Sequence, residues 1–299
     1  MKRVVTVPAT LDDRGFDSLV QEIADIDEAG EGGPGDRLLF DARHVRWADP
    51  YGMTGLLAIG TYLRGRGHTP LLQLPESSEV LSYLGRMGFF RLAGEAFEVN
   101  GAPRGRRAEA SSVLLEITPI NSHEDVHGVI DLVMDRAGTI LTERLHYSRV
   151  DAGMFSMVLS EVCQNIIEHA EAGGWVGIQT YNWAKRLGRQ VVVIAVMDLG
   201  VGFRGSLARE HAARFGDRWS DATALEAAFI HGTTRFRDPG RGQGLKQIRR
   251  RVTGWGGKVS IRSGTARIAD IPDWDDALPL QTGLAPFPGA QILIVLPAK

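Results

Sequence analysis

Hydrophobic and polar positions follow two different periods over the first third of the chain, and these predict alternating strands and helices. The spacing of Phe16, Leu19 and Ile23 is typical of a helix that buries one face. Asp49 and Pro50 suit the N-cap and the first position of a second helix. Strands are predicted over residues 2–7, 37–41 and 71–74, and helices over residues 16–29, 49–64 and 76–87. This order predicts a small α/β domain over residues 1–97.

The rest of the chain has longer periodic segments. Residues 98–111 have no apolar period, are rich in Gly and Arg, and are predicted to be a linker. Residues 268–288 carry several prolines and are predicted to be irregular. Helices are predicted over residues 122–141, 151–171, 221–229 and 245–252, and strands over residues 113–117, 175–183, 190–198, 258–262 and 291–296. A second domain is therefore expected over residues 112–299.

Composition narrows the class of protein. A chain of 299 residues suits two domains. The net charge of −2 gives no reason to expect nucleic acid or an anionic membrane as a partner. Cys163 is the one cysteine, so no internal disulfide can form, and a reducing compartment fits. No segment has the pattern of a signal peptide or the length of a membrane-spanning helix. We expect a cytoplasmic protein.

The first candidate motif lies on the helix predicted over residues 151–171. Glu161, Asn165 and His169 are spaced by four, so they lie along one stripe at the margin of the apolar face. The oxygen of a carboxamide is a hard ligand that suits Mg²⁺, and a carboxylate can orient or deprotonate a water or hydroxyl that attacks a phosphate. The same three residue types also occur on the hydrated face of ordinary helices, so the motif is weak when taken alone.

A second motif follows the apolar strand predicted over residues 190–198. The strand ends in Asp198, and Gly200 and Gly202 come directly after it. A carboxylate at a strand end can accept a hydrogen bond from an exocyclic amine, and the glycines allow the backbone to approach a flat base closely. A simple turn at the end of a strand is the alternative.

The third motif is a glycine-rich loop that leads into a helix. Gly240, Gly242 and Gly244 precede Leu245 and the helix predicted over residues 245–252. The free N–H groups and the dipole of a helix N-terminus form a ready site for an anion. Residues 249–251 are three arginines in the body of that helix, where a solvated or interdomain face is the expected role.

Taken in order, the three motifs resemble those of the GHKL family (gyrase, chaperone, histidine kinase and mismatch-repair ATPases), and the compact form is closest to the anti-sigma-factor kinases. The resemblance covers residues 112–299 and implies a Bergerat-type α/β sandwich, with a mixed sheet covered by helices on one face. It implies that ATP and Mg²⁺ are the cofactors, with Asp198 on the adenine amine, Asn165 on Mg²⁺ and Glu161 as general base.

The resemblance also gives roles to the loops of the second domain. Gly200, Gly202, Gly240, Gly242, Gly244 and Leu245 would shape the pocket. Residues 203–239 would be a mobile lid over the phosphates, with Thr234 near its end as a candidate phosphate contact. The last strand of the family usually starts Gly-Thr, whereas here Ala290 follows Gly289, which would remove one contact on the phosphate side.

The first domain resembles the STAS domain of anti-anti-sigma factors, over residues 1–97. In that family a serine at the start of a helix is phosphorylated, in an Asp-Ser-Ser-Gly pattern. Here the pattern is Asp49-Pro50-Tyr51-Gly52, so Tyr51 stands in place of the acceptor serine, and Thr54 lies one turn further on. The longer side chain of Tyr51 argues against phosphate transfer within this chain.

Three functions follow from these resemblances. The first is a nucleotide-gated switch, in which a slow ATPase acts on its fused STAS-like domain or on another protein. The second is a serine/threonine kinase of the anti-sigma-factor type that acts on a separate STAS partner. The third is a nucleotide-binding interaction protein without catalysis, which the intact Glu161 disfavours. The expected partners are an adenine nucleotide and a STAS or sigma-factor-like protein, and homodimerisation is left open.

Overall fold

The computed structural model describes the chain except for residues 1, 30–36, 101–114, 167, 169–171, 185–186 and 234–243. The predicted linker lies almost wholly outside the described residues, as do His169, Thr234, Gly240 and Gly242. Two sheets of four and five strands organise the described part of the chain, and a two-stranded pairing lies beside them.

The described residues from 2 to 100, called here the N-terminal layer, contain a parallel sheet with the strand order β1-β3-β5-β6. Its strands are β1 (Lys2–Thr6), β3 (Arg37–Asp41), β5 (Thr69–Gln73) and β6 (Glu98–Val99), with the short pair β2 (Thr10–Leu11) and β4 (Trp47–Ala48) beside them. Its helices are α1 (Asp13–Glu28), α2 (Pro50–Gly65), α3 (Ser78–Arg86) and α4 (Phe89–Ala96). The predicted strands and helices are confirmed. Helix α4 and the short strands were not predicted, because each is only two to eight residues long.

The two long helices of the N-terminal layer begin at the predicted kind of residue. Asp12 caps α1 by accepting from the N–H of Gly15, and Asp49 caps α2 by accepting from the N–H of Gly52 at 2.8 Å. Such caps satisfy N–H groups that have no partner within the helix.

The C-terminal part holds the five-stranded sheet, in the order β10-β11-β9-β8-β7. Its strands are β7 (Leu115–Ile120), β8 (Gly174–Trp183), β9 (Arg189–Asp198), β10 (Lys258–Asp270) and β11 (Leu280–Pro297). Every pairing among these strands is antiparallel, so the expectation of a mixed sheet is wrong for the described residues. Neighbouring strands of this sheet run in opposite directions whether they are joined by short turns or by helices.

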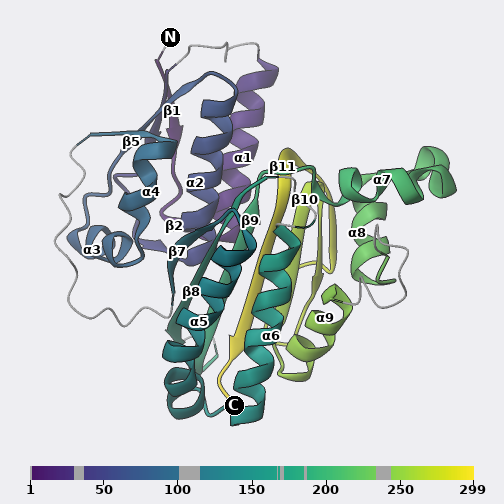
Figure 1. Ribbon diagram of the computed structural model, residues 1–299. Helices are drawn as coiled ribbons and strands as arrows, with labels where there is room; N and C mark the ends of the chain where they lie inside the picture. Colours follow the sequence, from purple (N-terminus) through teal and green to yellow (C-terminus); the bar gives the residue numbers. More distant parts are fainter. Residues whose placement is uncertain are drawn as a thin grey trace.

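Helices cover the face of this sheet that is seen in Figure 1. They are α5 (His123–Thr139, followed by a π-helical turn at Ile140–Arg144), α6 (Arg149–Asn165), α7 (Gly202–Phe215, followed by a 3-10 turn at Gly216–Arg218), α8 (Asp221–Phe229) and α9 (Gly244–Gly254). Helices α5, α6 and α9 lie across the sheet, whereas α7 and α8 lie beyond its β10 edge (Figure 1). Helix α8 has the predicted bounds, and α7 was not predicted.

The opposite face of the same sheet is covered by the N-terminal layer. In β9, Val192 and Ile194 pack among the helices α5, α6 and α9, while Val191 and Val193 belong to a continuous apolar cluster with the N-terminal layer. The alternation explains why β9 is apolar at every position from 191 to 197, since a strand buried on both faces has no solvated side. The helices of the C-terminal part thus lie on one face of the sheet, as expected, and the N-terminal layer covers the other.

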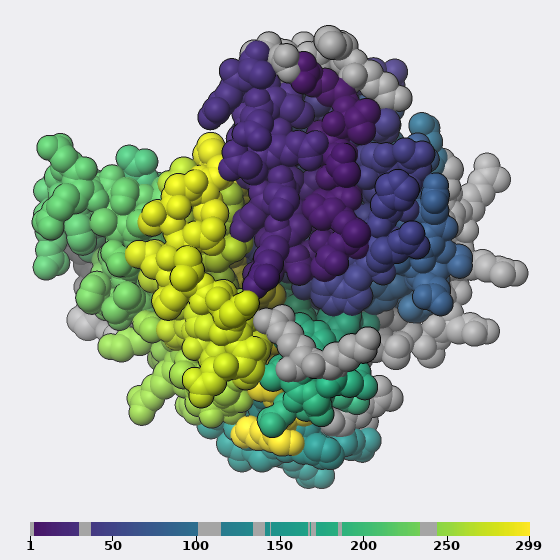
Figure 2. Space-filling view, turned by 180° about the vertical axis from the view of Figure 1, so that it is seen from behind, coloured from purple at the N-terminus to yellow at the C-terminus, as the bar shows by residue number. Residues whose placement is uncertain are grey.

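The contact between the two parts is close and mostly apolar. Figure 2 shows the purple N-terminal segment directly against the yellow C-terminal strand, in agreement with the packing of α1 on β11. The ring centroids of Phe16 in α1 and Phe287 in β11 lie 5.2 Å apart. The hydroxyls of Tyr83 and Tyr181 are hydrogen-bonded across the interface, and the N–H of Ile117 donates to the carbonyl of Met87 at 2.8 Å.

The stretch predicted to be irregular, residues 268–288, is largely β-structure. Strand β10 continues to Asp270, and β11 starts at Leu280 and pairs with it, with register shifts around Gly264. This end of the hairpin extends past β9, which pairs with β11 only from Gln291 onward. Prolines are accepted there because that part of β11 has a strand on one side only.

Candidate functional site

Asp198 lies at the end of β9, where the sheet gives way to a glycine-containing loop. Its carboxylate accepts from the N–H of Gly200 at 2.9 Å and from the N–H of Ala290 at 3.3 Å. Asp198 is 6 % exposed, and burial raises its pKa to about 6, although the two N–H groups act in the opposite direction. Burial of the ionised carboxylate costs free energy. A carboxylate that bears this cost and still has one oxygen for another donor is typical of a ligand-binding group.

Two glycines beside Asp198 keep the backbone close to it. Gly202 has a φ of +64°, and a Cβ there would lie 2.6 Å from the hydroxyl of Ser263. Gly289 has a φ of +76°, and a Cβ there would lie 2.0 Å from the carbonyl oxygen of Asp198. Any other residue would close this space and would also strain the backbone.

The side chain of Ser263 was not predicted to belong to the site. Its hydroxyl accepts from the N–H of Phe203 at 3.1 Å and donates to the carbonyl of Gly289 at 2.8 Å. It therefore joins the start of α7 to the start of the paired part of β11. A serine in the middle of a strand carries no sequence signal for this role, because only the fold brings β10 beside both glycine turns.

Glu161 of α6 lies against the first residue of α9. A Cβ on Gly244 would lie only 1.8 Å from the Oε1 of Glu161, so the glycine allows the carboxylate to reach the helix N-terminus. Burial raises the pKa of Glu161, and the charge of Glu168 adds to the effect. A carboxylate with a raised pKa is a better proton acceptor than one with an ordinary pKa, which suits a general base. Glu161 of the first motif and Gly244 of the third motif are thus brought together.

Asn165 lies one turn along α6 from Glu161, near the C-terminal end of the helix. Its amide nitrogen Nδ2 is buried and has no hydrogen-bond partner within the described part of the chain. A buried polar atom without a partner fits a site that is completed by a ligand. The next residue, Ile166, packs beside Gly174, which pairs with Asp198 in the sheet. The end of α6 and the end of β9 are therefore neighbours.

Part of the chain matches a known protein family. Residues 150–277 match the family of the Histidine kinase-, DNA gyrase B-, and HSP90-like ATPase (HATPase_c). This part of the chain is a GHKL-type ATPase domain. No curated protein matches the chain significantly. Domains of this type bind ATP.

Several candidate residues of the GHKL-type domain lie outside the described residues, namely Thr234, Gly240 and Gly242. Within the described residues, Gly200, Gly202 and Gly244 hold the positions given above, and Leu245 is half-buried against the apolar core of the domain. No group of three or more His, Cys, Asp or Glu side chains that could hold a metal ion occurs in the described chain.

Part of the stretch that was expected to be a lid is buried in the apolar core of the domain. Helix α8 lies within the stretch 203–239, but Leu225 and Phe229 are buried in the cluster that contains α6 and α9. Arg249 holds the C-terminal end of α8, since it donates to the carbonyl of Phe229 at 2.6 Å and pairs with Asp270 at 2.7 Å. The idea that the whole stretch is a mobile lid is therefore wrong for α8. The arginine run is likewise explained in part by this contact.

Ala290 also lies beside Asp198. Its N–H donates to the carboxylate of Asp198. It lies there because β11 comes beside β9 at the level of Asp198.

Neither hydroxyl considered as a phosphate acceptor is accessible. Tyr51 is 1 % exposed and Thr54 is fully buried, both at the start of α2 where it packs on β8 and β9. The hydroxyl of Thr54 donates to the carbonyl of Pro50 at 2.7 Å. Burial raises the pKa of Tyr51, which makes its hydroxyl a weaker nucleophile at neutral pH.

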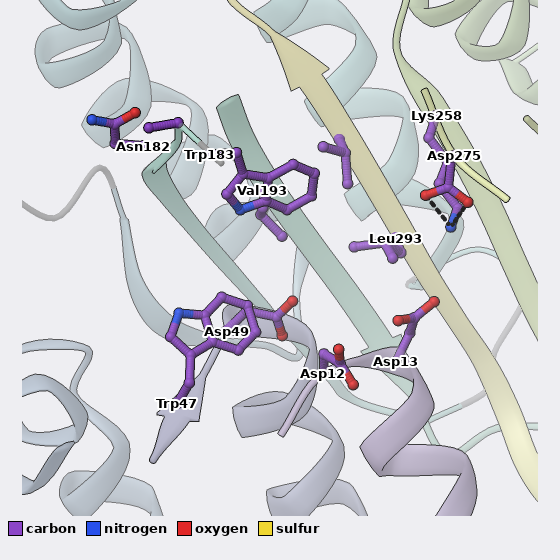
Figure 3. A pocket seen from close by; sticks show the side chains of 12 residues that line it. Asp12, Asp13, Trp47, Asp49, Asn182, Trp183, Val193, Lys258, Asp275 and Leu293 are labelled. Carbon is purple, nitrogen blue, oxygen red and sulfur yellow. Dashed lines mark hydrogen bonds and ion pairs between the residues drawn. The ribbon is translucent and has the colours of Figure 1, made fainter. Parts of the chain in front are cut away.

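A separate cavity of about 520 Å³ lies between the N-terminal layer and the sheet (Figure 3). Its polar side chains have structural partners: Asp12 and Asp49 cap helices, and Lys258 pairs with Asp275 at 3.1 Å. Trp47 and Trp183 line its apolar side. We assign this cavity to the interface and not to the nucleotide site.

Among the described helices, none is long and apolar enough to cross a membrane.

Proposed function

We propose that the chain is an ATP·Mg²⁺-dependent signalling protein in which the GHKL-type domain, a slow ATPase, acts as a nucleotide-gated switch. The observation that carries the catalytic part is the contact between Glu161 and Gly244. It places a carboxylate with a raised pKa at a helix N-terminus, where a phosphate is favoured. A domain that only bound nucleotide would gain nothing from a base at this position.

Each residue has a distinct task in this proposal. Asp198 accepts from the adenine amine, and the glycines at positions 202 and 289 let the neighbouring backbone pack closely beside it. The carboxamide oxygen of Asn165 would serve as a ligand for Mg²⁺. When bound, Mg²⁺ neutralises charge on the phosphates. Glu161 takes the proton from the attacking water, and the N–H groups at the start of α9 hold a phosphate oxygen.

The proposed target of the switch is the fused N-terminal layer, which we regard as a STAS-like domain (1–97) joined by a linker (98–111) to the ATPase module (112–299). Burial of Tyr51 and Thr54 supports transfer of the phosphate to water over transfer to this chain. A separate STAS or sigma-factor-like protein, met in the cytoplasm, is the other candidate target.

A serine/threonine kinase acting on such a separate protein is the second candidate. It is favoured by the same Glu161, because a base that deprotonates water can also deprotonate a hydroxyl. In that case the N-terminal layer would act in docking, since its own hydroxyls at the start of α2 are buried.

The test is incubation of the whole chain with γ-labelled ATP and Mg²⁺, with both free phosphate and protein-bound label followed. Free phosphate that disappears in Glu161→Gln, with nucleotide binding retained, supports the ATPase switch. Label on the chain that is lost in Tyr51→Phe would contradict it and favour transfer within the chain. Label that appears only on an added STAS protein would favour the kinase.

A further inference from the structure

Strand β10 has a bulge beside the nucleotide site, at residues 263–265, where its register with β11 shifts on both sides of Gly264. The hydroxyl of Ser263 bonds the N–H of Phe203 and the carbonyl of Gly289, so one side of the bulge supports the base end of the site. Gly289 is in turn packed against Asp198. Any movement of the β10 bulge therefore changes the surroundings of the Asp198 carboxylate.

The residue just before the bulge is held by the N-terminal layer. Arg262 is 1 % exposed, and its Nε donates to the carboxylate of Asp17 in α1 at 3.1 Å. The same carboxylate pairs with Arg267, on the other side of the bulge, at 2.7 Å. One side chain of α1 thus joins two arginines that flank residues 263–265.

Arg262 also holds the hairpin itself. Its guanidinium donates to the carbonyl of Ala285 at 2.5 Å, to the carbonyl of Gly264 at 3.3 Å and to the side chain of Gln291 at 3.3 Å. The planar guanidinium can satisfy several acceptors in a fixed geometry. Because Ala285 and Gln291 lie on the two sides of Gly289, Arg262 fixes the segment of β11 that approaches Asp198.

A third element meets the bulge from the other direction. Asp221, at the start of α8, accepts from the N–H of Thr265 at 2.9 Å and from its hydroxyl at 2.8 Å. A Cβ on Gly264 would lie 2.3 Å from the carboxyl carbon of Asp221, so the contact leaves no free space. The bulge is therefore in direct contact with α1, with α8 and with the base end of the site.

We propose that Asp17 is a positioning residue for the nucleotide site, and that docking of α1 through Asp17 and Arg262 is coupled to the binding of the adenine base. The proposal rests on the proposed function, since it names the internal contact by which nucleotide and N-terminal layer affect one another. Coupling of this kind is reciprocal: if docked α1 favours nucleotide binding, bound nucleotide favours docked α1 by the same factor.

The first experiment measures the dissociation constants of ADP and of inosine diphosphate, with Mg²⁺, for the whole chain. Inosine diphosphate has a carbonyl in place of the adenine amine, so the preference for ADP reports the Asp198 contact. Asp17→Asn removes the charge opposite Arg262 and Arg267 with little change in size. We expect it to weaken ADP binding about tenfold, within the usual range of coupling, and to reduce the preference for ADP. Asp17→Glu should restore part of the affinity for ADP and part of the preference for ADP over inosine diphosphate.

Asp275→Asn is the matched control. It also breaks a buried ion pair, with Lys258, whose side chains are 7 % and 4 % exposed. Lys258 lies on β10 about 17 Å along the strand from Ser263. Loss of either carboxylate leaves a buried cation without its partner and should lower the melting temperature. Only Asp17→Asn should change the preference for ADP.

The outcomes separate the two proposals. Wild-type chain that does not bind ADP would overturn the proposed function and this inference together. Wild-type chain that binds ADP, with an unchanged preference in Asp17→Asn, would overturn the inference alone. A second measurement needs no variant: ADP should slow hydrogen exchange of the amides of α1 in the wild-type chain. Protection around Asp198 without any change in α1 would also overturn the coupling, even if Asp17→Asn did not fold.

Discussion

At the scale of single residues, the most informative feature is the carboxylate of Asp198. Its pKa of about 6 lies well above the ordinary value of Asp, so its ionised form is the one that the fold disfavours. In the proposed function the ionised form is the better acceptor for an adenine amine, because hydrogen bonds to a charged oxygen are stronger. The residue is therefore held in a state that costs stability, which is common where a group serves binding.

Nucleotide affinity should consequently fall as the pH is lowered through about 6. About one tenth of the Asp198 side chains stay ionised one unit below the pKa, so the dissociation constant of ADP should rise about tenfold by then. Asp198→Asn should bind weakly and without this step, while its fold is at least as stable as that of the wild type near neutral pH. The measurement is calorimetric titration across the pH range. The same pH step in Asp198→Asn would show that another group causes it.

Gly244 gives a second prediction at this scale. Alanine normally stabilises a helix by about 1 kcal/mol relative to glycine. At position 244 its Cβ would lie 1.8 Å from the Oε1 of Glu161, so Gly244→Ala must displace that carboxylate. We expect ATP turnover to fall at least about a hundredfold, the lower end of what general-base catalysis contributes. Gly254→Ala, at the other end of α9 where no atom lies within 4 Å, is the control and should keep its turnover. Equal turnover in the two variants would contradict the role of Glu161.

At the scale of elements, the start of α2 can be tested through its cap. Burial raises the pKa of Asp49, so the folded chain holds that proton more tightly than the unfolded chain does. The contribution of Asp49 to stability therefore falls as the pH rises above the ordinary pKa of Asp. Asp49→Asn keeps an acceptor for the N–H of Gly52 and avoids the buried charge, whereas Asp49→Ala leaves that N–H unpaired.

By urea unfolding near neutral pH, we expect Asp49→Asn to be at least as stable as the wild type. Asp49→Ala should be less stable by about 1–2 kcal/mol, the usual cost of a lost cap. Below about pH 3 the pH-dependent part of the difference between the wild type and Asp49→Asn should disappear, because Asp49 is then neutral in both states. Equal stability of the Asn and Ala variants would show that the hydrogen bond to Gly52 has no value to the fold.

Elements with a clear period could be predicted from the sequence, and those that depend on distant partners could not. The cap at Asp49 and the bounds of α8 are local features, and the structure has them as predicted. Helix α7 was missed because only Leu207 is buried along it, so it has no apolar stripe. The part of β11 before residue 291 was missed because its pairing with β10 is non-local and tolerates prolines.

The residues of the candidate site differ in the same way, since some could be predicted from local motifs and one could not. Glu161, Asn165, Asp198 and Gly244 occur in motifs that are continuous in the sequence, and they could be named from it. Ser263 could not, because its role comes from the approach of β10 to two turns that are distant in the chain.

At the scale of the whole molecule, the N-terminal layer and the sheet form one apolar core. The face of the sheet away from α5, α6 and α9 presents Val191, Val193, Leu293 and Val295 to α1 and α2. Burial of such side chains contributes about 1.5–3 kcal/mol each. The layer is thus part of the structural support of the ATPase domain, whatever signal it also carries.

A chain that begins at residue 112 should therefore not fold into a stable monomer. Without the N-terminal layer it would expose the face that contains Val193 and Leu293, and an apolar patch of that kind promotes association. We expect the fragment to be aggregated, or to bind a hydrophobic dye strongly. Co-production with residues 1–100 as a separate chain should restore a one-to-one complex that binds ADP. Size-exclusion chromatography with light scattering gives the result. A monomeric fragment that binds ADP as tightly as the whole chain would show that the N-terminal layer supports neither the sheet nor the site, and the proposed switch would then need another target.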